Sequence, residues 1–118
     1  MILVDTSVWS RHFRRADGTL VRLLEDRSVL THAWIVGELA LGPGMRLGIV
    51  RDLLALPGLP TVPDSELLAF VELHRLRGIC WVDAQLLLAA IRAGATLWTL
   101  DAALAAEARR FEVGGEPA

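Results

Sequence analysis

The segment ILVDTS, residues 2–7, joins a short apolar run to three polar residues of the kind found at helix N-termini. It predicts a buried strand over residues 2–4 that leads directly into a helix. Similar apolar runs recur at residues 29–31, 59–62 and 96–100, separated by helical patterns. Strands that alternate with helices predict crossover connections, and therefore an α/β fold with a mostly parallel sheet covered by helices on both faces.

The patterns between these runs predict helices and one further strand. Leu20, Leu23 and Leu24, for example, have the i, i+3, i+4 spacing of an apolar helix face. The expected helices cover residues 7–13, 19–26, 33–41, 45–56, 64–76, 83–93 and 101–110, and a last strand covers residues 111–113. We expect the whole chain, residues 1–118, to form one domain with a polar tail from about residue 114.

The composition is that of a globular protein. Of the 118 residues, 53% are hydrophobic and 22% are charged. Uncharged stretches such as residues 53–63 are too short for a membrane span, which needs about 20 apolar residues. No basic region or long apolar run precedes Asp5, so we expect a cytoplasmic protein without a secretory signal. Cys80 is the single cysteine, which excludes an intramolecular disulfide, and we expect it to pack in the core.

The basic residues limit how this chain could bind a nucleic acid. All 12 are arginines, and the formal net charge is -2. This balance argues against a module that binds nucleic acid through surplus positive charge alone, so local arginines or a bound cation would have to supply the attraction. Arg11, Arg14 and Arg15 have the i, i+3, i+4 spacing of one helix face. They would contact RNA phosphates there, or simply form a solvated surface.

Four carboxylates each stand alone among uncharged residues. They are Asp5 within residues 1–10, Glu38 within 28–45, Asp83 within 78–91 and Asp101 within 93–106. Most of the other acids have an arginine within a few residues, which is typical of solvated helix faces. A carboxylate buried in an apolar segment is costly unless a cation or hydrogen bonds compensate it. We therefore expect each of the four to have a partner.

Two arrangements would supply such partners. In the first, the three aspartates cap the predicted helices at whose starts they stand, and Glu38, which is mid-helix, pairs with an arginine from another segment. In the second, the four acids converge, because Asp5 and Asp101 directly follow parallel strands whose ends share one sheet edge, and the other two acids lie on adjoining helices. Their repulsion would then be relieved by a divalent cation. An all-oxygen ligand set suits Mg²⁺ or Mn²⁺.

Several segments, taken in order along the chain, resemble the motifs of PIN-domain ribonucleases, and specifically the VapC toxins of bacterial toxin–antitoxin pairs. They are LVDTS at residues 3–7, Glu38, WVDAQLLLAA at residues 81–90 and LWTLDAAL at residues 97–104. The resemblance covers nearly the whole chain. It implies a three-layer α/β/α fold with a central, mostly parallel sheet of four or five strands.

The resemblance also implies the site and its activity. Asp5, Glu38, Asp83 and Asp101 would form the acidic metal cluster, with Thr6 and Thr99 as supporting hydroxyls. One or two Mg²⁺ or Mn²⁺ ions would activate water and stabilise the leaving oxygen as RNA is hydrolysed. Asp5 and Asp83 are expected to bind metal directly, while the other two acids complete the cluster or orient water. A VapB-like antitoxin and a homodimer are implied as partners.

Three other classes share parts of this pattern. A phosphoacceptor receiver domain would require a lysine near its last strand, and this chain contains none. A haloacid-dehalogenase-like phosphatase would carry a second aspartate where Ser7 stands. A non-catalytic protein-interaction module, in which the acids cap helices or bind a basic partner, stays open as the alternative.

Overall fold

The structure is a computed structural model that describes residues 1–117. Within these residues, four parallel strands form one sheet in the order β3-β2-β1-β4. They are β1 (Ile2–Val4), β2 (Val29–His32), β3 (Gly58–Leu59) and β4 (Thr96–Trp98). The expected parallel α/β sheet is confirmed, with four strands.

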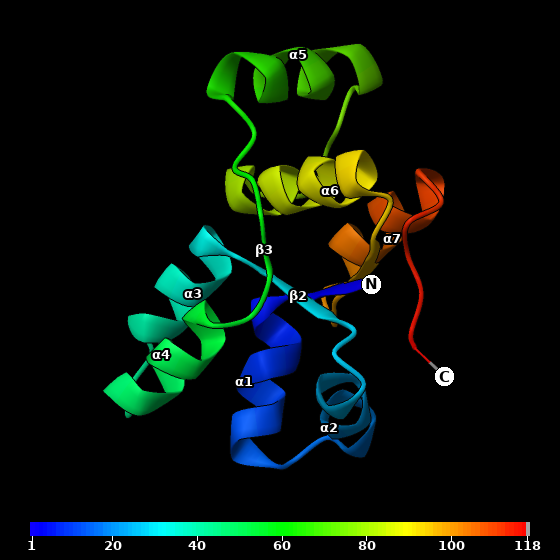
Figure 1. Ribbon diagram of the computed structural model, residues 1–118. Helices are drawn as coiled ribbons and strands as arrows, with labels where there is room; N and C mark the ends of the chain where they lie inside the picture. The colour runs from blue at the N-terminus through cyan, green and yellow to red at the C-terminus, as the bar shows by residue number, and fades with distance from the viewer. Residues whose placement is uncertain (118) are drawn as a thin grey trace.

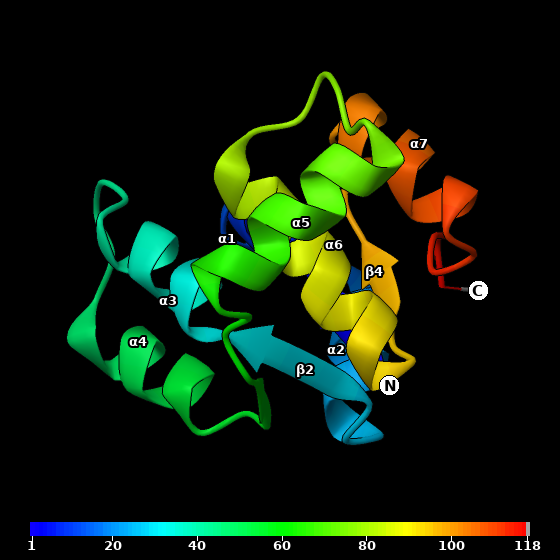
Figure 2. The same ribbon diagram turned by 90° about the horizontal axis from the view of Figure 1, so that it is seen from above.

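Helices cover both faces of this sheet. The described residues form α1 (Thr6–Arg14), α2 (Gly18–Glu25), α3 (Ala33–Ala40), α4 (Leu47–Leu54), α5 (Asp64–His74), α6 (Trp81–Ala93) and α7 (Ala102–Arg110). In Figure 1, α5 and α6 lie above the sheet and α1 and α2 lie below it. The view from above shows α5 and α6 in front of the strands, and α3 and α4 side by side at one flank (Figure 2). This arrangement confirms the three layers.

The core lies where α6 packs on the sheet. Leu3 and Val4 of β1 are fully buried, and so are Leu86 and Leu87 of α6. Every residue from 84 to 90 of α6 is buried, which explains why the apolar residues of this helix run almost continuously instead of forming one stripe. No helix within residues 1–117 is long and apolar enough to span a membrane.

The third strand is shorter than expected. It was expected over residues 59–62 but ends at Leu59, because Pro60 has no N–H for a strand ladder. The backbone of Val62 is instead paired by the buried side chain of Gln85. The Val62 N–H donates to Oε1 of Gln85 at 2.7 Å, and Nε2 of Gln85 donates to the Val62 carbonyl at 3.0 Å.

The final strand expected at residues 111–113 is not formed. The chain turns there with Glu112 in the left-handed region at φ 61°, and a single parallel bridge joins Leu97 to Gly114. A Cβ on Gly114 would lie 2.8 Å from the backbone nitrogen of Arg109, so the close approach requires glycine. Residue 118 of the expected polar tail lies outside the described residues.

Candidate active site

Asp5 is placed at the sheet edge by the register of the two central strands. Val4 of β1 pairs with Trp98 of β4, and the Asp5 N–H donates to the Trp98 carbonyl at 2.9 Å. The Asp5 side chain is therefore brought beside the residues that follow β4. Although Asp5 precedes α1 at the N-cap position, its side chain makes no capping hydrogen bond. The capping expectation is wrong for this residue.

Hydroxyl groups hold the Asp5 carboxylate instead. Its Oδ2 accepts hydrogen bonds from Thr99 Oγ1 at 2.7 Å and from Ser7 Oγ at 2.8 Å, and its Oδ1 accepts from Thr6 Oγ1 at 3.2 Å. Only 4% of Asp5 is exposed. These three hydrogen bonds compensate a nearly buried charge without a cationic side chain.

Two of these three hydroxyls, those of Ser7 and Thr99, are also fixed by hydrogen bonds from the backbone after β4. Ser7 Oγ accepts from the Leu100 N–H at 3.0 Å, and Thr99 Oγ1 accepts from the Asp101 N–H at 3.1 Å. Because each hydroxyl receives a backbone N–H, its own proton is directed at Asp5. Thr6 and Thr99 were expected as supporting residues. Ser7 was missed, and its only sequence signal was its position two residues after Asp5.

Glu38 faces this site from the middle of α3. Its side chain is exposed, yet its pKa is raised above the ordinary value, first by partial loss of water around the carboxylate and then by the negative charges of Asp5 and Asp83. The expected pair with an arginine is not formed, since no salt bridge involves Glu38 within residues 1–117.

Asp83 approaches from the first turn of α6. The helix begins at Trp81 with exposed Cys80 as its N-cap, so Asp83 is not the cap and Cys80 is not in the core, contrary to both expectations. Burial raises the pKa of Asp83 most, hydrogen bonding with Cys80 opposes this, and the charges of Asp5 and Asp101 raise it further. Asp83 thus lies within electrostatic reach of acids that follow two different strands.

Asp101 has a second, structural task. Its Oδ1 accepts from the Leu104 N–H at 3.0 Å, which caps α7. Here the capping expectation is confirmed. The side chain is exposed at the end of β4, and its second carboxylate oxygen has no hydrogen bond in the described part of the chain.

The four solitary acids therefore surround one sheet edge, where the charges of their neighbours help to raise the pKa values of Glu38 and Asp83. None of them forms a salt bridge within residues 1–117; the ion pairs found there are Arg11–Asp17, Arg92–Glu66 and Arg110–Glu107. Carboxylates that repel one another and have no cationic side chain beside them are a donor set that a hard divalent cation would stabilise.

The arrangement also limits how an ion could be held. Among residues 1–117, no three Asp, Glu, His or Cys side chains are close enough together to hold one ion. Direct ligation by one or two carboxylates, completed by water and a substrate phosphate, is the usual mode for Mg²⁺. The oxygen-only chemistry of the site fits that mode and not a closed cage of protein ligands.

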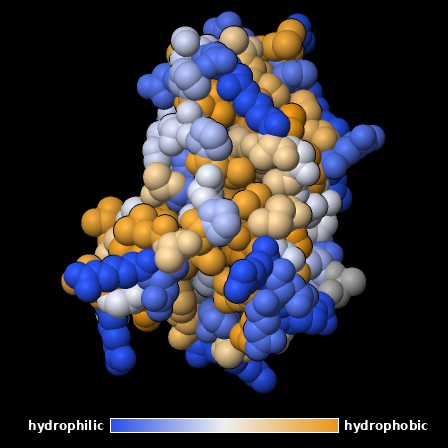
Figure 3. Space-filling view, in the orientation of Figure 1, coloured by the Kyte–Doolittle hydropathy of each residue, from blue (hydrophilic) through white to orange (hydrophobic). Residues whose placement is uncertain are grey.

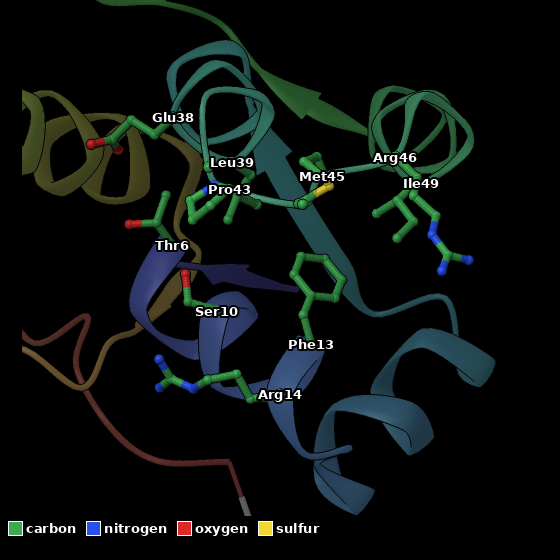
Figure 4. A pocket seen from close by; sticks show the side chains of 12 residues that line it. Thr6, Ser10, Phe13, Arg14, Glu38, Leu39, Pro43, Met45, Arg46 and Ile49 are labelled. Atoms are coloured by element: carbon green, nitrogen blue, oxygen red, sulfur yellow. The ribbon is translucent and has the colours of Figure 1, made fainter.

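A pocket of about 550 Å³ adjoins these acids, between α1 and the segment that joins α3 to α4. Thr6 and Glu38 lie at one end of it, and Met45, Arg46 and Ile49 at the other (Figure 4).

The three arginines expected on one helix face are divided by the structure. Arg14 lines this pocket. Arg11 pairs with Asp17 at 2.8 Å, and Arg15 follows the end of α1 in an extended conformation. Their contact with RNA stays a prediction.

Comparison with known proteins gives two results. The family described as "PIN domain" matches residues 2–109. Two curated relatives, each called "Ribonuclease VapC32", come from the CDC 1551 / Oshkosh and ATCC 25618 / H37Rv strains of Mycobacterium tuberculosis. Each is 48% identical over 110 residues, which cover 90% of this chain and 89% of the relative.

Proposed function

Because this chain belongs to the PIN-domain family, we propose that it is a metal-dependent endoribonuclease that hydrolyses RNA phosphodiester bonds and serves as the toxin of a toxin–antitoxin pair. The observation that carries this proposal is the group of four carboxylates at one sheet edge, which lack a cationic partner among the described residues and in which neighbouring acids raise the pKa values of Glu38 and Asp83. The ribonuclease activity is supported by the two relatives, each called Ribonuclease VapC32.

Each of the four acids would have its own role in the reaction. Asp5, oriented by Ser7 and Thr99, would hold a Mg²⁺ or Mn²⁺ ion together with Asp83. Such an ion would lower the pKa of a water molecule and neutralise charge on the scissile phosphate. The raised pKa of Glu38 suits its carboxylate to accept a proton from the attacking water. Asp101 would complete the cluster while capping α7.

The proposed partners are an RNA, a VapB-like antitoxin and a second copy of the chain. An RNA substrate would place the activity in the cytoplasm. Leu41, Leu47 and Leu54, on or beside α3 and α4, are 89%, 65% and 62% exposed. Apolar atoms gather over these helices in the space-filling view (Figure 3). Clustered exposed leucines support a protein partner on this flank.

The decisive experiment compares RNA cleavage by the wild type and by Asp5→Asn, purified in parallel, with Mn²⁺ or with EDTA. We expect cleavage by the wild type with Mn²⁺ alone, and a loss of at least about 100-fold in Asp5→Asn, as is typical when an essential electrostatic group is removed. Asp52→Asn, which changes an exposed carboxylate of α4, should keep full activity. A non-catalytic interaction module would give no metal-dependent cleavage in any of the three proteins.

A further inference from the structure

The pocket beside Glu38 has a chemistry that the acid cluster does not explain. Its volume of about 550 Å³ is within the range of small-molecule sites, roughly 300–1,000 Å³. One wall is apolar and is formed by Phe13, Met45 and Ile49, while Arg14 and Arg46 bring positive charge to the rim. Figure 4 shows the Phe13 ring next to Met45, with Thr6 and Glu38 toward the other end of the pocket.

The Phe13 ring is held in place and still offers a surface. It stacks on Trp9 with a centroid distance of 5.8 Å and an interplanar angle of 26°, and Trp9 itself is buried. Phe13 remains 39% exposed. A ring that is fixed on one side and open on another loses little conformational entropy when a flat ligand stacks on it.

The charges of the pocket are not satisfied by the protein. Within residues 1–117, neither Arg14 nor Arg46 forms a salt bridge, with Glu38 or with any other acid. Two guanidinium groups and one carboxylate leave a positive balance at this place in a chain whose formal net charge is -2. An anionic group at the rim would be attracted there.

We propose that this pocket binds the nucleobase adjoining the scissile phosphate of an RNA strand, with the base stacked on Phe13 and a neighbouring phosphate contacted by Arg14. This inference rests on the proposed ribonuclease function. An unstacked nucleotide combines a flat, mostly apolar base with an anionic phosphate, which is the pairing that the pocket offers. An apolar peptide side chain would fill the wall and leave both arginines without a partner.

The position of the pocket supports a role in choosing the cleavage site. Thr6 and Glu38 belong both to its lining and to the surroundings of Asp5. A base bound here would therefore fix which phosphate of the strand reaches the acids. Phe13 would hold the base and Arg14 would position the phosphate, so the acids would not need to read the sequence themselves.

The test uses a short single-stranded RNA that the wild type cleaves, with the cleavage position mapped. Abasic nucleotides are then placed in turn at the positions flanking the cleaved bond, and kcat/KM is measured for each RNA. At one position we expect the abasic change to lower the kcat/KM of the wild type by about 10-fold, which is within the range for one base stacked on an aromatic ring. Phe13→Ala should lower kcat/KM on the intact RNA by a similar factor. The kcat/KM of this variant should then be the same for the intact and the abasic RNA.

Two further variants separate this role from a folding defect. Ser10→Trp, at an exposed position of the lining, should fill the pocket and also abolish the difference between base and abasic RNA. Phe111→Ala removes a Phe that packs on Phe70 and His74, away from the pocket, and should keep the wild-type difference. Arg14→Ala should weaken cleavage of both RNAs equally, and Arg51→Ala on α4 should not.

The following results would overturn the proposal. If the wild type cleaves intact and abasic RNAs equally at every flanking position, the pocket holds no base while the ribonuclease function stands. If Phe13→Ala keeps the base dependence but no longer binds an inhibitory antitoxin, the occupant is a protein side chain. If the wild type cleaves no RNA with Mn²⁺ or Mg²⁺, the proposed function itself fails.

Discussion

Ser7 and Thr99 show how single hydroxyls can organise a charged site. Both donate to the same oxygen of Asp5, at 2.8 and 2.7 Å, and both receive a backbone N–H from the segment after β4. The orientation of Asp5 therefore depends on two strands that are distant in sequence. Residues that orient a metal ligand contribute to affinity without touching the metal.

Replacing the Thr99 hydroxyl should weaken metal binding. Thr99→Val keeps the shape of the side chain but removes the hydrogen bond to Asp5, so we expect Mn²⁺ affinity to fall by about 10- to 100-fold, the usual cost of losing an orienting partner. Isothermal titration of the purified protein measures this directly. Thr96→Val, in strand β4 that precedes Thr99 and without a side-chain hydrogen bond to Asp5, is the matched control. Equal affinities for both variants and the wild type would contradict the role assigned to Thr99.

The carboxylate pKa values should change in a pattern that reports which acids face each other. Asp5 raises the pKa of both Glu38 and Asp83, whereas Asp101 raises only that of Asp83. Asp5→Asn should therefore lower both values, and Asp101→Asn should lower the pKa of Asp83 alone. Carboxyl NMR titration of the metal-free protein measures this. A fall in the pKa of Glu38 on Asp101→Asn would show that the acids are arranged differently.

These raised pKa values would also set the pH dependence of the proposed metal binding. A raised pKa means that Glu38 and Asp83 take up protons at a higher pH than isolated carboxyls do. Protons compete with the cation for these groups, so Mn²⁺ affinity should decrease as the pH falls through their pKa values.

At the scale of the elements, α6 connects the core to the site. Its buried residues pack on the sheet, its first turn carries Asp83, and buried Gln85 pairs with both backbone groups of Val62. That pairing fixes the chain between β3 and α5 without a strand. A side chain that satisfies two buried backbone groups replaces two hydrogen bonds of a sheet ladder.

Removing the Gln85 amide should destabilise the protein more than its volume change implies. In Gln85→Met the Val62 N–H and carbonyl lose their partners, and each unsatisfied buried group costs about 1–3 kcal/mol. We expect the free energy of unfolding to fall by about 2–4 kcal/mol in urea titrations. Leu87→Met, at an equally buried position of α6, is a volume-conserving control with an expected cost below about 1.5 kcal/mol. A similar cost for both variants would show that Val62 finds other partners.

The elements that sequence patterns predicted well are those that local chemistry determines. Residues 2–4 form a strand and residues 64–74 a helix close to the expected bounds, because apolar periodicity and a following or preceding polar residue mark them. The end of β3 depended on Pro60 and on Gln85, which is distant in sequence. The turn at residues 111–113 depended on the packing of Gly114 against α7.

At the site, too, features set by local chemistry could be predicted from the sequence, and features set by contacts distant in sequence could not. Four isolated acids could be singled out from their uncharged surroundings, although only Asp5 is buried and Glu38 and Asp101 are exposed. The role of Ser7 could not be recognised, since it follows from the register that sets β1 beside β4. Likewise, Arg11, Arg14 and Arg15 were separated by the end of α1 and by the ion pair to Asp17.

For the whole molecule, the proposed metal site would reduce the stability of the metal-free protein. Folding brings together carboxylates that repel one another, and a group whose pKa is raised in the folded state lowers stability at pH values above that pKa. Strained or repulsive groups of this kind are typical of functional sites. A bound cation reverses the effect, because a ligand that binds only the folded state stabilises it.

Glu38→Gln tests both effects in one variant. Without metal at pH 7 it removes one repelling charge, so the free energy of unfolding should rise slightly, by about 0.5 kcal/mol or less, the scale of exposed charge interactions. With saturating Mn²⁺ the wild type should instead have the higher free energy of unfolding. A ligand at 100 times its dissociation constant adds about 2.7 kcal/mol, and the variant, which binds the ion more weakly, should gain less. Urea titrations with EDTA and with Mn²⁺ measure the stability difference between the two proteins without and with the metal. Because Glu38 is exposed and makes no hydrogen bond within the described residues, a loss of metal-free stability would mean that its charge is compensated in the folded protein and that the four acids do not form one repelling group.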